Sequence, residues 1–557
     1  MFCIHGACAI IDSMSKVSEY LNEHLRGEVT TDEGVRNSLS TDGSVLSIVP
    51  DMVVYPRTTS DLRKVARFCW QLSEKGHKLP ITMRGGGTDL TGAAIGSGVV
   101  VNTTAHMDAL FELDAKQKLV RVQPGVTFRA LNQALKLHGL HVPSYPATHA
   151  YSTIGGAIAN NASGIFSGRY GSTSAWVKQL EIVLSNGEVL QTGKLSKKDL
   201  ERKKGQQTFE GEIYRNVDNL IADNEKVIDS LAIEVRDNIG YNIVDVKTRD
   251  GSCDLTPLFV GSQGTLGIIS EIILQAEPIG GIPLVGAVAF TDIESARDGM
   301  EALATLNPAV LEYVDVRIIE QAVANGNKYE FYSDALEADK VAAIVVMEFD
   351  DPNDRAKKKI AKKISKLFKD KQVYLQVETD EIKASELQLL ANIPSMSLAA
   401  DKTRQSDPGV LYGVYIPPDR FEEFLQSVEK LEAKYHVQLP LSGHVTQGVF
   451  NARLLVDMTK ANDRHKTLKL LAEWTTVVYA HGGHLMGEAS EGRLKTTFAY
   501  KEIDEEAVKL FNSVRDIFDP LGIMNTGVKQ STDMKKLVEM LRTDYDSVSF
   551  AGYVAGE

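Results

Sequence analysis

The sequence of 557 residues has few cysteines and no long hydrophobic run. Its four cysteines are too few and too scattered for a disulfide framework, and no Cys-x-x-Cys pair indicates zinc or an iron–sulfur cluster. Cys3 and Cys8 are close enough in sequence to bind a metal or to pair, but terminal cysteines without a role are the simpler interpretation. We therefore expect a protein of a reducing compartment.

Positive charge is also in deficit. The chain has 61 Lys and Arg against 74 Asp and Glu, a net charge of −13, so no global field attracts a phosphate backbone and nucleic acid is not an expected partner. No stretch reaches the roughly 18 apolar residues of a membrane span, and the first residues lack the pattern of a secretion signal. We expect a cytoplasmic protein, with peripheral contact at the inner face of a membrane left open.

The composition is that of an ordinary globular protein. Hydrophobic residues make up 43% of the chain and charged residues 24%, which excludes intrinsic disorder as its main character. At roughly 150 residues per domain, the length predicts two to four folding units.

Residues 53–92 predict a strand, a helix, a second strand and a glycine-rich loop. Ser60 is expected to cap this helix, and Gly76 to end it in a left-handed conformation. A second capped helix is predicted from Thr127 to Gly139. The apolar side of the first helix consists of four residues at helical spacing: Leu62, Val65, Ala66 and Cys69.

Between residues 177 and 278, short β-branched runs predict mixed α+β structure. After Pro278 the pattern changes to repeated strand-then-helix units, which predict an antiparallel sheet with helices on one face, as in ferredoxin-like domains. A domain boundary is therefore expected near residue 279. The predicted strands are 286–290, 342–349 and 412–416, and the helices that follow them are one capped by Asp292, 354–368 and 420–435.

A lysine-rich run at residues 355–371 has two interpretations. Ile360, Ile364 and either Leu367 or Phe368 recur at helical spacing, so the lysines are expected on the wet face of an amphipathic helix. A docking face for an acidic partner or an anionic lipid is the alternative.

Glycine is concentrated in three loops. Six of the fifteen residues from Arg84 to Gly98 are glycine, which lets successive backbone N–H groups converge on an anion. The spacing matches neither a P-loop nor a Rossmann turn, so a phosphate cradle and a structural turn both remain open. With the segments TIGGAIANNASG (153–164) and LFVGSQGTLGII (258–269), this loop could surround a long, diphosphate-bearing cofactor.

These motifs resemble a known family. Five motifs follow one another in the chain: RGGGTDLTG, QPGVTF (123–128), TIGGAIANNASG, RYGSTSAWVKQLEIVLSNGEVLQTG (169–193) and FVGSQGTLGII. This ordered set resembles the FAD-binding domain of the vanillyl-alcohol oxidase/PCMH flavoproteins. The branch it resembles contains D-lactate and D-2-hydroxyglutarate dehydrogenases and glycolate oxidase subunits. The resemblance implies an α+β fold: an N-terminal extension (1–45), a PCMH-type FAD-binding domain of two α+β subdomains (46–278), a ferredoxin-like cap domain (279–500) and a C-terminal helical segment that returns to the FAD domain (501–557).

The resemblance also implies a noncovalently bound FAD, whose diphosphate lies on the Arg84–Gly92 loop. No His or Cys stands at the positions used for a covalent flavin link, although a tether through His149 stays open. The implied cofactor-binding residues are Arg84, Gly85, Gly86, Gly87, Thr88, Asp89, Gly92, Pro124, Gly125, Thr153, Gly155, Gly156, Ala159, Asn161, Gly164, Gly264, Ile269 and Asn525.

The substrate half departs from the family pattern. In the motifs at 442–458 and 482–495, His444 and Glu488 stand at two metal-ligand positions, whereas Asn451 and Ala489 replace two histidines. A divalent metal rebuilt from His444, His484 and Glu488 is open but not favoured, because a zinc site usually has three protein ligands with imidazole or thiolate among them. The same three residues are the candidate bases, and the candidate substrate-binding residues are Tyr241, Asn242, Tyr412 and Arg453.

The resemblance places Leu390 and Leu411 where the family has a carboxylate-binding Arg and Lys. Without those cations, D-2-hydroxyglutarate is a disfavoured substrate. We expect an FAD-dependent oxidoreductase that oxidises a CH–OH donor, D-lactate dehydrogenase-like, and passes electrons to a quinone, cytochrome, flavoprotein or oxygen. A homodimer or monomer is expected. The alternatives are a catalytically degenerate flavin-binding subunit of a larger complex and, more remotely, ether-lipid synthesis.

Overall fold

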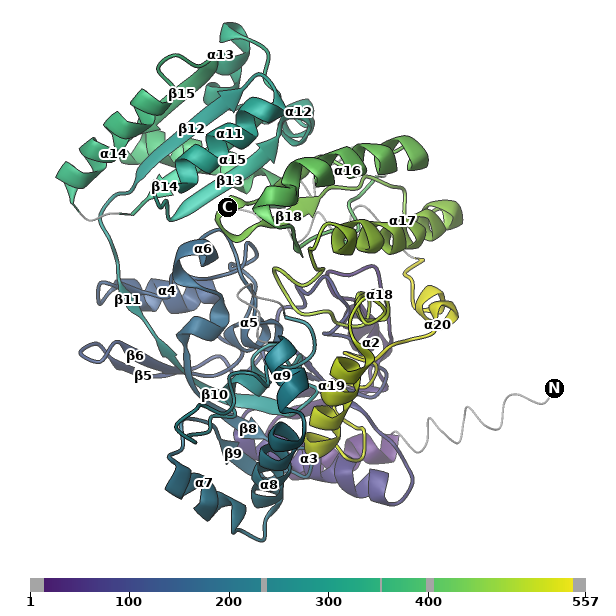
Figure 1. Cartoon of the computed structure of the whole chain (residues 1–557). Coiled ribbons are helices and arrows are strands. Elements are labelled where there is room, and N and C mark those ends of the chain that lie inside the picture. Colours follow the sequence, from purple (N-terminus) through teal and green to yellow (C-terminus); the bar gives the residue numbers. More distant parts are fainter. Residues whose placement is uncertain (1–14, 232–237, 351–352, 397–404, 544–557) are drawn as a thin grey trace.

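The computed structural model describes residues 15–231, 238–350, 353–396 and 405–543. Two parts of the chain lie one above the other in Figure 1. The lower part holds the first half of the chain, in purple and blue, together with the yellow C-terminal helices, and the upper part holds the teal and green segments. The positions Cys3 and Cys8 fall outside the described residues.

The lower part contains two sheets, and in the first of them β2 and β3 both pair parallel with β4 while β1 pairs antiparallel with β2. The second sheet is antiparallel throughout. The first sheet has the order β1 (Glu28–Thr30), β2 (Met52–Tyr55), β4 (Val99–Asn102), β3 (Ile81–Arg84), and the second β5 (Leu110–Asp114), β6 (Leu119–Val122), β10 (Ile268–Gln275), β8 (Val177–Val183), β9 (Val189–Gln191). A short ladder pairs β7 (Leu140–His141) with β11 (Glu277–Pro278).

Helix α3 (Thr59–Glu74) connects β2 to β3, and its cap corrects one prediction. Thr58, not Ser60, is the N-cap, since the Thr58 side chain accepts a hydrogen bond from the Asp61 N–H. Gly76 has φ +86°, as expected for the left-handed end of a helix. The other helices of this part are α2 (Glu33–Ser38), α4 (Phe128–Lys136), α5 (Ile154–Asn160), α6 (Ser167–Tyr170), α7 (Lys197–Lys204), α8 (Phe209–Asp223), α9 (Glu225–Leu231) and α10 (Thr256–Phe259).

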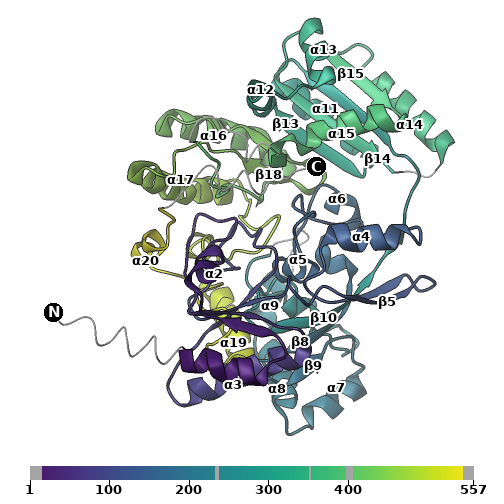
Figure 2. The same ribbon diagram turned by 180° about the vertical axis from the view of Figure 1, so that it is seen from behind.

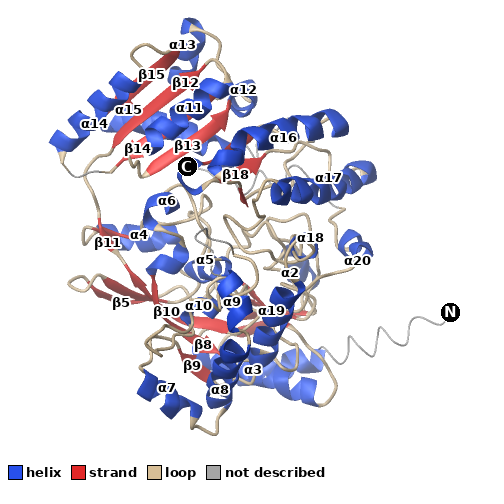
Figure 3. Ribbon diagram, in the orientation of Figure 1, coloured by secondary structure: helices blue, strands red, loops and turns tan. Residues whose placement is uncertain are grey.

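The upper part is built on one antiparallel sheet of seven strands, shown in red in Figure 3. The strand-then-helix units expected from the sequence are present, and Asp292 caps the first helix by accepting from the Ser295 N–H. The strand order is β15 (Val373–Glu378), β12 (Leu284–Phe290), β14 (Ala343–Phe349), β13 (Val310–Asp315), β17 (Leu441–His444), β18 (Val449–Ala452), β16 (Val414–Tyr415).

Helices cover both faces of this sheet, rather than the single face predicted. Helices α11 (Ile293–Ala304), α14 (Asp354–Leu367) and α16 (Phe421–Tyr435) pack on the face that carries Phe290 and Tyr313. Helices α12 (Val316–Ala324), α13 (Glu330–Ala338) and α15 (Glu381–Met396) pack on the opposite face, which carries Val285 and Ile344. Strands buried on both faces are mostly apolar along their whole length, so their sequence does not show the alternation of a one-sided sheet.

The lysine-rich helix α14 has the amphipathic form expected of it. Ile364 and Phe368 are buried, whereas Leu367 is 37% exposed and takes no part in the core. Lys357 departs from the expected exposure of the lysines on this helix, because its side chain is buried and its ammonium donates to the Ile282 carbonyl.

The C-terminal helices lie against the lower part of the molecule. Helix α19 (Glu505–Phe518) packs on α8, and both views show it beside that helix (Figures 1 and 2). Met524 then forms a parallel bridge with Ile81 of β3. Helix α17 (Ala461–Ala480) packs beside α16 in the upper part, and the remaining helices are α18 (Thr496–Ala499) and α20 (Met534–Glu539). Among the described residues, every helix is too short or too polar to span a membrane.

Candidate functional site

A cavity of about 490 Å³ lies between the glycine loops and the inner face of the seven-stranded sheet. Three loops far apart in sequence line one side: residues 84–91, 152–163 and 262–269. Strands β13, β14, β17 and β18 and helix α15 line the other side. The lower and upper parts of the molecule therefore share one site.

Most of the predicted cofactor-binding residues face this cavity. Those that line it are Arg84, Gly85, Gly86, Gly87, Thr88, Asp89, Pro124, Thr153, Gly155, Gly156, Ala159, Gly264 and Ile269. His149 also lines it, and burial lowers the pKa of its imidazole.

Five predicted residues do not reach the cavity: Gly92, Gly125, Asn161, Gly164 and Asn525. The glycines among them permit close packing, since a Cβ at Gly164 would lie 2.1 Å from a backbone oxygen. Asn161 ends helix α5 in the left-handed conformation with φ +46°. The Asn525 side chain is buried and donates to the carbonyls of Ala93 and Gln263, which ties two glycine loops together.

The glycine loop fits an anionic diphosphate. A Cβ at Gly85 would lie 2.1 Å from Thr153 Oγ1, so only glycine allows the first two loops to approach this closely. Within the described chain, the backbone N–H groups from Gly86 to Asp89 have no protein acceptor, and these residues are half-buried on the cavity wall. Successive N–H groups without an acceptor form a site for phosphate oxygens.

We expect the substitution Gly86→Ala to weaken FAD binding about 10- to 100-fold. The added Cβ would lie 2.3 Å from the Tyr151 carbonyl oxygen, and forcing the loop to move costs about 1–3 kcal/mol. Titration of apoprotein with FAD, followed by quenching of flavin fluorescence, measures the change. Gly281→Ala is the matched control, because its Cβ would meet nothing closer than 3.8 Å. Equal affinity in both variants would contradict this assignment of the loop.

His444 lies at the end of β17 and faces the cavity. It is 7% exposed, and its Nδ1 lies 2.6 Å from Oε1 of Glu312 on the adjacent strand β13, directly opposite in register. Burial by itself lowers the pKa of His444, but the carboxylate of Glu312 and, less strongly, that of Glu488 outweigh it and raise the pKa to about 9. Burial raises the pKa of Glu312. The imidazole is therefore held by one nitrogen at a fixed position on the cavity wall.

Glu488 and Lys495 bring charge from the C-terminal half to the glycine loops. The Glu488 side chain lines the cavity, and its backbone carbonyl accepts from the Ser163 N–H at 3.1 Å. The Lys495 ammonium donates to the carbonyls of Tyr412 and Leu485. Burial lowers the pKa of Lys495 to about 8, against the opposing charges of Glu488 and Asp89.

His484, the third predicted catalytic residue, does not line the cavity. Its backbone pairs with that of Tyr415 in an antiparallel bridge, which turns its ring onto the Tyr415 ring at 5.0 Å between centroids. The proposed metal set of His444, His484 and Glu488 is therefore not assembled. Within the described ranges, no group of three or more His, Cys, Asp or Glu side chains gathers in a geometry that could hold a metal ion.

The two departures from the family pattern have different structural consequences. The Oδ1 of Asn451 accepts the Gly413 N–H at 2.6 Å, so this side chain fixes a backbone segment at the cavity wall. Ala489 also lines the cavity but contributes only a methyl group.

Of the predicted substrate-binding residues, only Tyr412 faces the cavity. Its hydroxyl donates to Asp407 at 2.8 Å, and burial raises the pKa of Asp407 to about 6. Tyr241 is buried elsewhere with its hydroxyl 2.7 Å from Thr265 Oγ1, and Asn242 is exposed and donates to Asp245. The Arg453 side chain is buried outside the cavity lining.

Helix α15 faces the cavity with residues other than the one predicted. Leu390 packs in the core with Val285 and Ile344, and Leu411 is also buried in a core. The α15 residues on the cavity wall are Gln388, Ala391, Asn392 and Pro394. Among the described residues, α15 therefore brings the amide side chains of Gln388 and Asn392 to the cavity wall, where the resemblance implied Leu390.

Sequence reasoning missed three charged residues of the cavity: Glu312, Glu348 and Lys495. The two glutamates interrupt otherwise apolar strands, VLEYVD and AIVVMEF. A carboxylate within a buried strand is costly unless it is paired, so this interruption was a usable signal.

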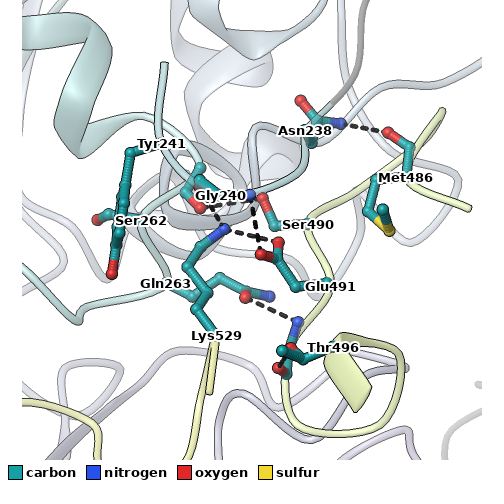
Figure 4. Close-up of polar contacts among 12 residues, drawn as sticks. Asn238, Gly240, Tyr241, Ser262, Gln263, Met486, Ser490, Glu491, Thr496 and Lys529 are labelled. Carbon is teal, nitrogen blue, oxygen red and sulfur yellow. Dashed lines mark hydrogen bonds and ion pairs between the residues drawn. The ribbon is translucent and has the colours of Figure 1, made fainter. Parts of the chain in front are cut away.

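Behind the glycine loops, a fully buried ion pair joins three segments of the chain (Figure 4). Lys529 Nζ lies 2.6 Å from Glu491 Oε2 and donates to the Gly240 carbonyl, and neither charged side chain has any solvent exposure. Glu491 also accepts from the Gly240 N–H and from the Tyr500 hydroxyl. The pair thus connects the strand-rich first half, the segment after Glu488 and the C-terminal return.

Comparison with known proteins identifies the class of this molecule. Residues 50–193 match the family described as FAD binding domain, and residues 284–528 match the family described as FAD linked oxidases, C-terminal domain. The solved structure of p-cresol methylhydroxylase shares the fold, with a TM-score of 0.68 at 14% identity over 93% of this chain and 98% of that one. The first half of the chain thus matches an FAD binding domain and the second half the C-terminal domain of FAD linked oxidases, and FAD is its cofactor.

Several curated relatives are named as hydroxyacid dehydrogenases or as a glycolate oxidase subunit. D-2-hydroxyglutarate dehydrogenase of Haemophilus influenzae is 26% identical over 95% of this chain and 54% of that protein. Glycolate oxidase subunit GlcD of Bacillus subtilis is 25% identical over 88% of this chain and 91% of its own length. The chain spans about half the length of the D-2-hydroxyglutarate dehydrogenases it matches.

Proposed function

We propose that this protein is an FAD-dependent dehydrogenase that oxidises a CH–OH donor, as its hydroxyacid relatives are named to do. The observation that carries the proposal is the His444–Glu312 pair on the wall of the same cavity that the glycine loops line. The candidate cofactor residues that line this cavity would hold the flavin nucleotide, with its diphosphate at the N–H groups of Gly86 to Asp89. The domain division at residues 45, 278 and 500 is part of the same proposal.

Oxidation of an alcohol removes a hydride from carbon and a proton from oxygen. Bound FAD supplies the hydride acceptor. The side chain of His444, in its neutral form, takes the hydroxyl proton on Nε2, because Nδ1 is held by Glu312. Glu312 fixes the orientation of the imidazole and stabilises the imidazolium that forms. The apolar walls from Val310, Val346 and Ile269 exclude water around the reacting carbon.

This assignment predicts an alkaline pH dependence. The base is the neutral imidazole, which is scarce below its pKa of about 9, so kcat/KM should rise about tenfold per pH unit up to pH 9 and level off above it. Glu312→Gln removes the charge that raises the pKa, so the midpoint should move to lower pH. The pKa of Lys495 is about 8, and this side chain does not contact Glu312. Any effect of Lys495 on the pH profile should therefore be the same in the Glu312→Gln variant. Stopped-flow rates between pH 6 and 10.5 measure both profiles.

The function is tested by anaerobic reduction of the bound flavin. The purified protein should show a flavin visible spectrum that bleaches with a member of a panel of D- and L-2-hydroxyacids and other alcohols, with and without chelator. Photoreduction of the same sample shows that the flavin is reducible. If the flavin photoreduces but no alcohol bleaches it, the result contradicts the dehydrogenase and supports the second candidate function described next.

That second candidate is a flavin-binding, catalytically degenerate subunit of a larger complex. It is favoured by Asn451, whose side chain is occupied by the Gly413 N–H, and by Ala489, which has no proton-accepting group. For the enzyme, we propose that electrons pass to a quinone, a cytochrome, a flavoprotein or oxygen. Localisation in the cytoplasm, with or without peripheral membrane contact, and a monomer or homodimer are further parts of this proposal.

A further inference from the structure

We propose that the sheet wall of the cavity recognises a positively charged ammonium group on the substrate through the carboxylate of Glu348. This inference rests on the proposed function and names its substrate class: an alcohol that carries an amine rather than a carboxylate.

Glu348 is an inward-facing residue of β14, an interior strand of the sheet, and lines the cavity. Its side chain is 7% exposed. The Oε2 atom accepts from Gln388 Nε2 at 2.7 Å, while Oε1 has no donor among the described residues. A carboxylate oxygen of a mostly buried side chain that faces a cavity without a donor is a site for a hydrogen-bond donor of a ligand.

The register of the sheet places Glu348 beside the proposed reaction centre. Glu348 lies opposite Val310 on β13, and Glu312 of the same strand lies two residues further on, opposite Val346. Diagonal neighbours of this kind are about 7–8 Å apart. His444 lies opposite Glu312 on the next strand. His444, Glu312 and Glu348 therefore share one face of the sheet, with β13 between the other two strands, and a substrate whose hydroxyl lies at His444 can extend along this wall toward Glu348.

The surroundings of Glu348 suit an ammonium. Tyr145 and Phe166 line the same cavity with their ring centroids 5.8 Å apart. Tyr145 and Glu348 both line this cavity, and burial, and in addition the charge of Glu348, raise the pKa of the Tyr145 phenol to about 12. Aromatic rings beside a carboxylate attract a cation through both the ring quadrupole and the charge. Burial also raises the pKa of Glu348, and a bound cation would offset that penalty.

The cations that line the cavity are held away from this wall. Arg84 donates to the carbonyls of Thr41 and Ala94, beneath the glycine loop. Lys495 donates to two carbonyls and is balanced by Glu488 and Asp89. On the sheet wall itself, the imidazole of His444 is matched by Glu312. The charge that remains at Glu348 is therefore negative, and a substrate carboxylate there would be repelled.

Three alcohols that differ in one group test the proposal: lactate, 1,2-propanediol and 1-amino-2-propanol, each as both enantiomers. Anaerobic flavin reduction by the holoenzyme should give the highest kcat/KM with the amino alcohol and the lowest with lactate. In Glu348→Gln, the value for the amino alcohol should fall about 10- to 100-fold, the loss of one charge-assisted hydrogen bond, while that for lactate stays or rises. Glu337→Gln, an exposed glutamate of α13, is the control and should change neither.

A binding measurement separates this inference from the proposed function. Butylammonium and butyrate are titrated into the holoenzyme, and the change in the flavin spectrum is followed. Butylammonium should bind more tightly than butyrate, and Glu348→Gln should remove that preference, whether or not any alcohol is oxidised. Tighter binding of butyrate, higher activity with lactate, or equal losses for all three alcohols in Glu348→Gln would overturn the proposal. Flavin content checks folding, and Glu348→Asp, which keeps the charge, should retain the cation preference.

Discussion

His444→Gln should lower the rate of flavin reduction by substrate about 10²- to 10⁴-fold while leaving FAD bound. Glutamine fills much of the space of the imidazole but cannot accept a proton, and loss of a general base costs a factor of this size. The rate is best measured near pH 9.5, where the wild-type imidazole is neutral. The visible spectrum of each preparation reports the flavin content.

Two other histidines provide the comparison. His465→Gln changes an exposed residue of α17 and should keep the wild-type rate. His484→Gln should keep most of it as well, because that ring packs on Tyr415 and does not line the cavity. Equal losses in His444→Gln and His484→Gln would show that the wrong histidine has been assigned.

Lys529→Met should be the most destabilising single change among those considered. It leaves the Glu491 carboxylate fully buried without its cation, which costs about 3–5 kcal/mol. The loss should appear as a lower midpoint of urea denaturation. We also expect weaker FAD retention, since the pair ties the segment that follows Glu488 to Gly240 and to the C-terminal return (Figure 4).

A double variant tests the electrostatic origin of that loss. Lys529→Met combined with Glu491→Gln removes both charges and keeps an oxygen for the Gly240 N–H and the Tyr500 hydroxyl. It should therefore be more stable than Lys529→Met alone. Lys535→Met, at an exposed lysine of α20, controls for the general effect of replacing a lysine by methionine. A double variant that is less stable than the single one would point to lost packing instead of an unpaired charge.

The parts of the fold that could be predicted depend on local sequence. Thr127 caps α4 and Asp292 caps α11 as expected, because capping requires only a side-chain oxygen and an N–H three residues away. The sequence predicts a helix that Ser60 caps and Gly76 ends, and the structure has this helix with Thr58 as its cap, since both hydroxyl residues are acceptable caps and the backbone conformation chooses between them.

The parts that were missed depend on how elements pack. Leu390 was placed at a substrate position, whereas α15 turns Gln388 and Asn392 toward the cavity, and the rotation of that helix is set by packing on the sheet. Tyr241 is a predicted substrate-binding residue, yet its hydroxyl is hydrogen-bonded to Thr265 and its ring lies under Lys529. Glu312 pairs with His444 across 132 positions of sequence, a distance that no local pattern spans.

By itself, the amino-acid sequence determined the flavoprotein family, the glycine loops and the presence of His444 and Glu488, because backbone approach to a diphosphate restricts residue type locally. Only the tertiary structure decided which charged side chains line the cavity. Strand register pairs Glu312 with His444, and it pairs Glu348 with Val310, two residues before Glu312. The backbone bridge between Tyr415 and His484 keeps His484 out of the cavity wall. The reason is physical: the charge of a buried site is the sum over side chains from separate strands, and pairing between those strands exists only in the folded molecule.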